Sequence, residues 1–397
     1  MLSDFRKAFD RLRWDFLHEC LCRFGFQQEF RRWVFTLYSN IYSSVNVNGW
    51  LTEKINITRG VRQGCPLSAL LFILAAEILA IKIRCDPEIK GITMFKTVEV
   101  KILQFADDAT IFVEDCNSIP KVIKQIERFG SFSGLELNKE KCSLVNIKDF
   151  SVSANVEGIS WCDSEVKILG VYFGKDNNKV NYMNWSPKIN KIENLIKLWK
   201  TRKLTFFGKI TIIKSFLVSQ LIFNAQMISV PKDVMRKINS LLYFFLWNCK
   251  KDKVKRKVMC MGYEFGGLKM VDLDTLLRSF HMKWILIYFS STDSIWKRVM
   301  DGYFRRVGSF EFILNCSSNK HDIMNYLKNV KIPPYYKDVL YYWFDLKELN
   351  NNVSKLNTQC NVKNEDIWLN SYIKNSDGQV LFFKKWFDAG IKKYMIY

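Results

Sequence analysis

The sequence predicts an α+β fold in which an antiparallel sheet with packed helices is followed by a mostly helical remainder. Two observations support this class. Within the first 180 residues, stretches with apolar residues at helical spacing alternate with β-rich stretches, two of which flank an adjacent pair of aspartates within residues 98–114. Beyond residue 185, apolar residues recur mainly at helical spacing, beginning with Ile189, Ile192 and Ile196.

Residue patterns place individual elements along the first half. Pro66 suits the start of a helix because its missing N–H would be unpaired there anyway, and the apolar residues from about Leu67 onward should bury that helix against a sheet. Asn48 and Gly49 lie within an alternating segment and predict a hairpin turn. The other predicted segments are a helix with Leu12, Phe16, Leu17, Cys20 and Leu21 on one face, helices over residues 29–42 and 118–132, and a strand over residues 166–173.

The positive charge of the chain is unevenly distributed. Residues 1–180 hold 24 Lys and Arg against 22 Asp and Glu, whereas residues 181–397 hold 36 against 17, a net charge of +19. A strongly basic half predicts that it holds a polyanion, and a lysine-rich solvated surface is the alternative. Polar residues crowd over residues 175–183, where we place a boundary. The domains that we predict cover residues 1–178, 179–300 and 301–397.

Cysteine spacing and hydropathy bear on the cellular compartment. The 11 cysteines include no CxxC pair and the three histidines lie far apart, so neither a disulfide framework nor a zinc site is predicted. The longest apolar run, residues 67–81, is interrupted by Glu77 and is short for a membrane span. With no signal peptide in the sequence, we expect a soluble intracellular protein, nuclear or cytoplasmic, without a membrane partner. The oligomeric state is left open.

An adjacent pair of carboxylates, Asp107 and Asp108, stands between two apolar strands. Two such charges in a half-buried hairpin repel each other and resist burial, and a divalent cation removes that conflict. Mg²⁺ prefers hard oxygen ligands and usually binds one or two carboxylates together with substrate phosphates. A third carboxylate from a neighbouring strand would bridge two such ions, and Asp4 is the candidate. Taken alone, the pair is also what a solvated turn would contain.

Five segments, in a fixed order, resemble the palm motifs of reverse transcriptases from LINE-type (non-LTR) retrotransposons. They read DFRKAFD at residues 4–10, RGVRQGCPLS at 59–68, FADD at 105–108, GLELNKEK at 134–141 and ILGVYF at 168–173. Residues 198–205 and 266–270, the stretch from residue 367 to residue 386, and residues 390–391 are similar to the region that follows the palm in this family. The resemblance therefore covers essentially the whole chain.

The resemblance implies a fold and an activity. The implied fold is a polymerase palm with an antiparallel sheet and packed helices, followed by a helical thumb and a small helical C-terminal domain. The implied activity is RNA-directed DNA synthesis, in which a nucleotide is transferred onto a DNA 3′ end by two-metal chemistry with two Mg²⁺ ions. The implied partners are an RNA template, a DNA primer and deoxynucleoside triphosphates.

The family's functional residues can be carried over to single positions. The metal-binding and catalytic triad matches Asp4, Asp107 and Asp108. Lys141 matches the residue that protonates or neutralises the leaving pyrophosphate, although an exposed lysine is usually only a surface charge.

The resemblance also implies a set of nucleotide-binding positions, which are Phe5, Phe9, Gln63 and Gly64. Phe9 matches the aromatic gate that clashes with a ribose 2′ hydroxyl and so selects deoxynucleotides. The alternative for Phe9 is an ordinary core aromatic. Gly64 would permit close backbone approach to the nucleotide, and Gln63 would hydrogen-bond to its sugar or base.

Some features depart from the family pattern. Ala69 stands where the family usually has a second proline, a mild change because alanine is a good helix former. The fingers segment and the endonuclease domain that precede the palm in the family are not found in this sequence, nor is a Cys/His knuckle at its carboxyl end. Our second hypothesis is therefore a non-catalytic nucleic-acid-binding remnant of a retroelement. A third, an intron maturase with a similar palm, fits the later stretches less well.

A dense basic run, KKDKVKRK at residues 250–257, follows an aromatic and apolar helix predicted over residues 241–247. Behind a polymerase palm, we expect this run in a thumb that grips the phosphates of a template–primer duplex. A solvated loop or a nuclear-targeting patch is the alternative interpretation. Binding through such contacts should be salt-sensitive and largely indifferent to sequence.

Overall fold

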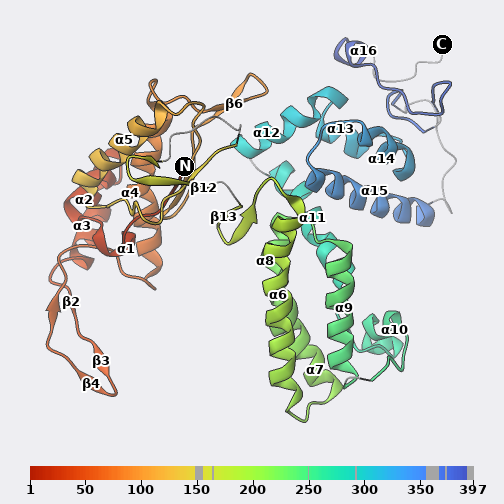
Figure 1. Cartoon of the computed structure of the whole chain (residues 1–397), viewed down its shortest axis with the longest axis horizontal. Helices are drawn as coiled ribbons and strands as arrows, with labels where there is room; N and C mark the ends of the chain where they lie inside the picture. The colour runs from red at the N-terminus through yellow and green to blue at the C-terminus, as the bar shows by residue number, and fades with distance from the viewer. Residues whose placement is uncertain are drawn as a thin grey trace. The chain divides into compact units, whose positions relative to one another are not determined.

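The computed structural model describes residues 1–147, 155–162, 165–248, 250–290, 293–354, 366–371 and 373–390. The chain divides into two compact units, Met1–Leu169 and Gly170–Tyr397 (Figure 1). The described part of the first unit mixes helices with short strands, and that of the second is almost entirely helical. The α+β class predicted from the sequence is confirmed.

The first unit contains short strands and helices of 4 to 20 residues. Its helices are α1 (Ala8–Arg11), α2 (Trp14–Arg23), α3 (Gln28–Leu37), α4 (Pro66–Cys85) and α5 (Ser118–Ser133). Its strands are β1 (Leu2–Ser3), β2 (Tyr42–Ser43), β3 (Asn46–Val47), β4 (Trp50–Leu51), β5 (Ile55–Asn56), β6 (Ile92–Met94), β7 (Val98–Val100), β8 (Ile102–Phe105), β9 (Asp108–Ile111), β10 (Leu144–Val145), β11 (Asn155–Val156), β12 (Ile159–Cys162) and β13 (Val166–Ile168).

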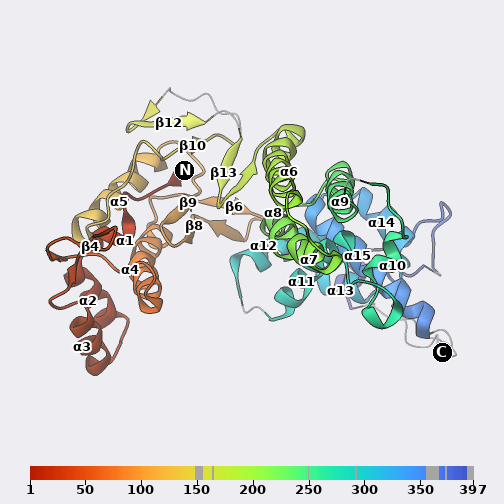
Figure 2. The ribbon, with the colours of Figure 1, turned by 90° about the horizontal axis from the view of Figure 1, so that it is seen from below.

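A three-stranded antiparallel sheet, in the order β1–β9–β8, lies at the centre of the first unit. Figure 2 shows α4 beside the β8–β9 hairpin, and α4 also packs against α2 and α5. Phe72 and Ile83 of α4 are fully buried, whereas Leu70 and Ile73 remain 61% and 51% exposed. The helix predicted from its apolar composition is therefore present, but its burial is confined to part of its surface.

Several predicted elements differ in length from those observed. The first predicted helix is broken between α1 and α2, and the helix expected over residues 29–42 ends at Leu37. The strand expected over residues 166–173 is two short strands, because Leu169 and Gly170 adopt positive φ angles of 47° and 85° and turn the chain. The hairpin at Asn48 and Gly49 is confirmed, with φ angles of 51° and 93°. The arm from β2 to β5 extends away from the helices (Figure 1).

Within the described part of the chain, two helices are long and apolar enough to cross a membrane by length and composition alone, Pro66–Cys85 and Phe206–Met227. The first is longer than the apolar run seen in the sequence, because the helix continues to Cys85. Both contribute residues to hydrophobic cores, Leu79 in the first unit and Leu217 in the second. In the two helices, 44% and 39% of the most apolar stretch is buried inside the protein.

The second unit is a series of helices. They are α6 (Asn177–Lys200), α7 (Phe206–Ile212), the π-helical segment η1 (Ile213–Val218), α8 (Ser219–Met227), α9 (Lys232–Leu246), α10 (Arg256–Cys260), η2 (Tyr263–Phe265), α11 (Leu273–Ser290), α12 (Ile295–Phe304), η3 (Arg305–Val307), α13 (Phe310–Asn315), α14 (Lys320–Lys328), α15 (Pro334–Ser354) and α16 (Lys384–Asp388), preceded by β14 (Val171–Phe173). The polar residues near 175–183 form a helix start, since the Asp176 carboxylate accepts the N–H groups of Asn178 and Lys179 and caps α6.

The described residues of the second unit form two separate hydrophobic cores. The first joins α6, α8 and α9, which lie side by side in Figure 1, and contains the fully buried Ile192, Ile238 and Leu246. The second joins α12 to α15 around Phe304 and Phe344, both with no exposed surface. Each core buries apolar side chains of its own set of helices, and this burial stabilises their packing.

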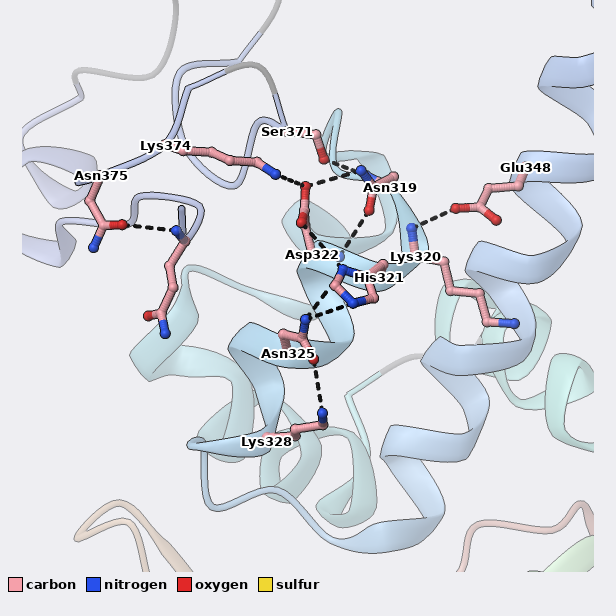
Figure 3. Close-up of polar contacts among 11 residues, drawn as sticks. Asn319, Lys320, His321, Asp322, Asn325, Lys328, Glu348, Ser371, Lys374 and Asn375 are labelled. Atoms are coloured by element: carbon pink, nitrogen blue, oxygen red, sulfur yellow. Dashed lines mark hydrogen bonds and ion pairs between the residues drawn. The ribbon is translucent and has the colours of Figure 1, made fainter. Parts of the chain in front are cut away.

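Polar contacts attach the segment after residue 366 to α14 (Figure 3). Asn319 caps α14 by accepting the N–H of Asp322, and its own N–H donates to Ser371 Oγ at 2.7 Å. Lys374 Nζ lies 2.8 Å from the Asp322 carboxylate, which keeps the pKa of Asp322 below its usual value despite burial. These contacts join the C-terminal segment to the second core.

Candidate active site

The register between β1 and β9 determines where Asp4 lies. The two strands are antiparallel, with Leu2 opposite Thr110 and Ser3 opposite Ala109. Continuing this register by one residue brings Asp4 opposite Asp108. Ser3 Oγ reinforces the pairing by donating to the carbonyl oxygen of Ala109 at 3.0 Å.

A tight turn between β8 and β9 carries the aspartate pair. Phe105 pairs with Asp108 across the hairpin, and Ala106 and Asp107 form its turn, with a φ of 52° at Ala106. The Gln104 side chain donates to the carbonyl oxygen of Ala106 at 3.1 Å and stabilises the turn. The strand, turn and strand predicted from the sequence are confirmed, with Asp107 in the turn and Asp108 at the first position of β9.

The carboxylates of Asp4 and Asp107 affect that of Asp108. Burial, followed by the negative charges of Asp107 and Asp4, raises the pKa of Asp108 above its usual value. Repulsion of this kind is relieved by a cation. Among the described residues, however, no group of three or more His, Cys, Asp and Glu side chains is arranged as it would be around a metal ion. The triad residues are thus neighbours without forming a preassembled ligand cluster.

The segment that precedes Lys141 pairs with the segment around Asp4. Phe5 forms an antiparallel bridge with Leu137, and the Asn138 N–H donates to the carbonyl oxygen of Asp4 at 2.8 Å. This pairing brings Lys141 Nζ within 3.6 Å of Asp4 Oδ2, although the lysine side chain is 71% exposed. Lys141 therefore lies at the carboxylate group, on a side chain that is free to move.

Phe9, the predicted gate, is held by a second aromatic ring. Its ring stacks on that of Phe72, with 4.6 Å between the ring centroids and an angle of 15° between the planes. Phe72 lies on α4 and is fully buried, whereas Phe9 is half-buried at the edge of the core. The ring of Phe9 therefore has one packed face.

The loop that carries Gln63 and Gly64 is attached to α1 and to the residues that follow it. The N–H of Gly60 donates to the carbonyl oxygen of Leu12 at 2.7 Å, and that of Val61 donates to the carbonyl oxygen of Phe9 at 2.6 Å. Gly60 has a φ of +88°, and a Cβ atom there would lie 2.7 Å from the carbonyl oxygen of Asp10. Only glycine permits this approach.

Gln63 and Gly64 lie on the exposed part of this loop. Gly64 has a φ of +86°, but an added Cβ would meet nothing within 4 Å. Glycine is therefore favoured at this position by the positive φ and not by lack of space. Gln63 also lines a cavity of about 530 Å³. The same cavity is lined by Tyr38, Tyr42, Arg59 and Arg62, among others.

Phe5 is placed differently from the other predicted nucleotide contacts. Its side chain is 4% exposed and packs in the core of the first unit, so only its backbone lies along the site. Sequence reasoning assigned no role to two residues that contact predicted site residues, Asn138 beside Asp4 and Phe72 beside Phe9. Asn138 lies inside the recognised GLELNKEK segment, which was the available signal for it.

Known proteins share the sequence around these residues. A family model described as "Reverse transcriptase (RNA-dependent DNA polymerase)" matches residues 1–173. A curated Xenopus laevis protein, "Transposon TX1 uncharacterized 149 kDa protein", is 25% identical over 348 residues, which cover 86% of this chain and 26% of that protein. The Drosophila melanogaster "Retrovirus-related Pol polyprotein from type-2 retrotransposable element R2DM" is 28% identical over 260 residues, which cover 61% of this chain and 23% of that protein.

The chain thus spans about a quarter of the length of these two relatives. A solved telomerase structure from Candida albicans, in complex with the TWJ fragment of telomeric RNA, has a TM-score of 0.35 and 14% sequence identity. That alignment covers 75% of this chain and 48% of the telomerase chain, and the likeness is too distant to bear on function. The family match and the retrotransposon relatives agree with the five motifs. Residues 1–173 therefore form a reverse transcriptase domain of the kind found in non-LTR retrotransposon polyproteins.

Proposed function

We propose that this domain catalyses RNA-directed DNA synthesis, extending a DNA 3′ end with deoxynucleoside triphosphates on an RNA template. The observation that supports the proposal is the β1–β9 register, which brings Asp4 opposite Asp108 at the end of the central sheet. The raised pKa of Asp108 agrees with it, because Asp4 and Asp107 both contribute to the shift. A structural hairpin would gain nothing from three mutually repelling carboxylates.

Reverse transcriptases generally use divalent metal ions, and the donor chemistry of this site suits such an ion. Carboxylate oxygens are hard ligands, and the repulsion at Asp108 is of the kind that a cation relieves. We assign two Mg²⁺ ions to Asp4, Asp107 and Asp108. When bound, such ions activate the attacking 3′ oxygen and stabilise the leaving pyrophosphate. The side chains of the triad would have to converge further for this, since they form no closed cluster.

Other residues of the domain would bind and select the nucleotide. The half-buried ring of Phe9, packed on Phe72, would exclude a ribose 2′ hydroxyl by contact. Gln63 is an exposed donor and acceptor on the loop attached to Phe9 through Val61, and it would contact the sugar or base. Lys141 would leave Asp4 and supply a proton or a positive charge to the pyrophosphate.

We further propose that residues 179–300 act as a thumb that grips a template–primer duplex and that residues 301–397 form a C-terminal domain. Two separate hydrophobic cores among the described residues of the second unit support two domains there, but the second core already includes Ile285 and Met300 and so begins before residue 301. The described residues of the basic run 250–257 are all exposed, so their charges are available to phosphates. Among the described residues, Arg256 is the one basic side chain of this run in an ion pair, and its partner is Asp252 of the same run.

Primer extension on an RNA template, with Mg²⁺ and deoxynucleotides, tests the proposal. We expect extension by the full chain and its loss in the Asp107→Asn/Asp108→Asn variant. Asp15→Asn is the matched control, because it removes an exposed carboxylate that pairs with Arg13 away from the triad. If the chain binds template–primer without extending it, the second hypothesis, a non-catalytic nucleic-acid-binding remnant, replaces the first.

A further inference from the structure

The backbone of Asn138 is fixed at both ends of its peptide unit. Its N–H donates to the carbonyl oxygen of Asp4 at 2.8 Å. Its own carbonyl oxygen accepts the N–H groups of Lys141 at 3.0 Å and Cys142 at 3.1 Å. The residue is 9% exposed. The backbone of Asn138 is therefore held in a fixed position beside Asp4, and so is the start of its side chain.

That side chain contacts the Asp4 carboxylate. Asn138 Nδ2 lies 3.3 Å from Asp4 Oδ2, the same oxygen that Lys141 approaches at 3.6 Å. Both donors serve Oδ2, and Oδ1 of Asp4 has no hydrogen-bond donor among the described residues. Because both donors contact Oδ2, they fix the orientation of the Asp4 carboxylate and thereby the direction of Oδ1.

Burial makes Asn138 an unfavourable choice for packing alone. Its Oδ1 atom is buried and has no hydrogen-bond partner within the described part of the chain. A buried amide that is only half satisfied is less favourable than an apolar side chain of similar size. The contact with Asp4 supplies a reason for an amide at this position.

Asn138 and Lys141 differ in how firmly they can hold Asp4. The Lys141 side chain is 71% exposed. Holding it against Asp4 costs side-chain conformational entropy, because several of its bonds would otherwise rotate freely. The Asn138 side chain is short and buried, and the backbone to which it is attached is fixed by three hydrogen bonds. The amide can therefore orient the carboxylate even after the lysine has moved away.

We propose that Asn138 is a positioning residue that orients the Asp4 carboxylate for a divalent cation. Its side-chain Nδ2 donates to Oδ2 of Asp4 and so leaves Oδ1 available to the ion. The inference rests on the proposed function, since it assumes that Asp4 is a metal ligand. Partners that orient ligating carboxylates in this way change metal affinity or activity by about 10- to 100-fold when they are removed.

The test measures Mn²⁺ binding without turnover. The full chain is mixed with a dideoxy-terminated primer on an RNA template and the matching deoxynucleotide, and free Mn²⁺ is followed by electron paramagnetic resonance. We expect Asn138→Ala to raise the Kd for Mn²⁺ by about 10- to 100-fold. Asn138→Ser keeps a turn-forming polar residue, but its side chain is too short to reach Asp4. It should raise the Kd for Mn²⁺ by the same factor, and it serves as the test if the alanine variant folds poorly.

Two controls separate positioning from general damage. Ser133→Ala removes a buried hydroxyl that donates to the carbonyl oxygen of Phe129 at 2.9 Å without contacting Asp4, so it should leave the Kd unchanged. In the Asp4→Asn background, removing Asn138 should have no further effect on the Kd, because the carboxylate that it orients is gone.

The outcomes distinguish the inference from the function on which it rests. If Asp4→Asn weakens Mn²⁺ binding but both Asn138 variants stay within threefold of the wild type, the inference is wrong and the proposed function stands. If Ser133→Ala weakens binding as much as Asn138→Ala, the effect is structural and the inference is again wrong. If the wild type binds no more Mn²⁺ than Asp4→Asn, both fail.

Discussion

Gly60 and Gly64 offer a matched pair of alanine substitutions that differ in one physical respect. Both have nearly the same positive φ, +88° and +86°, so each Ala variant carries about 1–2 kcal/mol of backbone strain. At Gly64 the new Cβ meets nothing within 4 Å, but at Gly60 it would lie 2.7–2.9 Å from backbone atoms of Asp10. Those atoms cannot rotate away.

The loop would therefore have to move in the Gly60→Ala variant. Movement breaks the bond from Gly60 N to Leu12 O and that from Val61 N to Phe9 O, which are 2.7 and 2.6 Å long. At about 0.5–1.5 kcal/mol each, their loss destabilises Gly60→Ala by a further 1–3 kcal/mol relative to Gly64→Ala. The difference between the unfolding free energies of the two variants isolates this effect, because both carry the same backbone strain.

Urea unfolding followed by hydrogen exchange of peptides from α4 and β9 measures this difference within the first unit. Reporting on these peptides avoids treating the two-unit chain as one cooperative system. If the two variants have unfolding free energies within about 0.5 kcal/mol of each other, the close approach of Gly60 to Asp10 does not constrain the loop, and the reasoning is refuted.

Three further predictions concern the site and its surroundings. Phe9→Ala should lower the preference for deoxynucleotides over ribonucleotides by about 10- to 200-fold in kcat/KM, and an unchanged ratio would show that Phe9 is only a core aromatic. Because the pKa of Asp108 is raised, its protonated form is favoured by folding, so stability falls as the pH rises from the usual carboxyl value of 3.8 through the raised pKa. In metal-free buffer, Asp108→Asn should therefore have a higher Tm than the wild type at pH 7 and an equal Tm below that window, and a lower Tm at pH 7 would contradict this. Replacing Lys253 and Lys255, both exposed, by Gln should reduce the slope of log affinity against log salt for template–primer by about two, and an unchanged slope would place the duplex elsewhere.

Local sequence patterns predicted the local structure well. The hairpin at Asn48 and Gly49 follows from two residues that accept positive φ angles. The helix expected over residues 118–132 is present as α5, and Gly134 ends it with a φ of +80° and an N–H bond to the carbonyl oxygen of Gly130. In each case the determining interactions lie within a few residues of one another.

The contacts that build the site lie far apart in the sequence. The β1–β9 register could not be predicted because β1 is too short to show an alternating pattern, so motif order alone pointed to Asp4. The contact between Asn138 and Asp4 joins residues separated by 134 positions, and no local pattern signals it. Phe5, which a motif resemblance singled out, is 4% exposed and forms a bridge with the distant Leu137.

Single-turnover primer extension by Asp4→Asn, Asp108→Asn and the double variant tests the central claim, that these carboxylates act together in one catalytic site. Residues that act as a unit are strongly non-additive, so the double variant should be no slower than the slower single variant. If instead the two single effects multiply, or if Asp4→Asn extends primers at the wild-type rate, Asp4 does not share a site with Asp108.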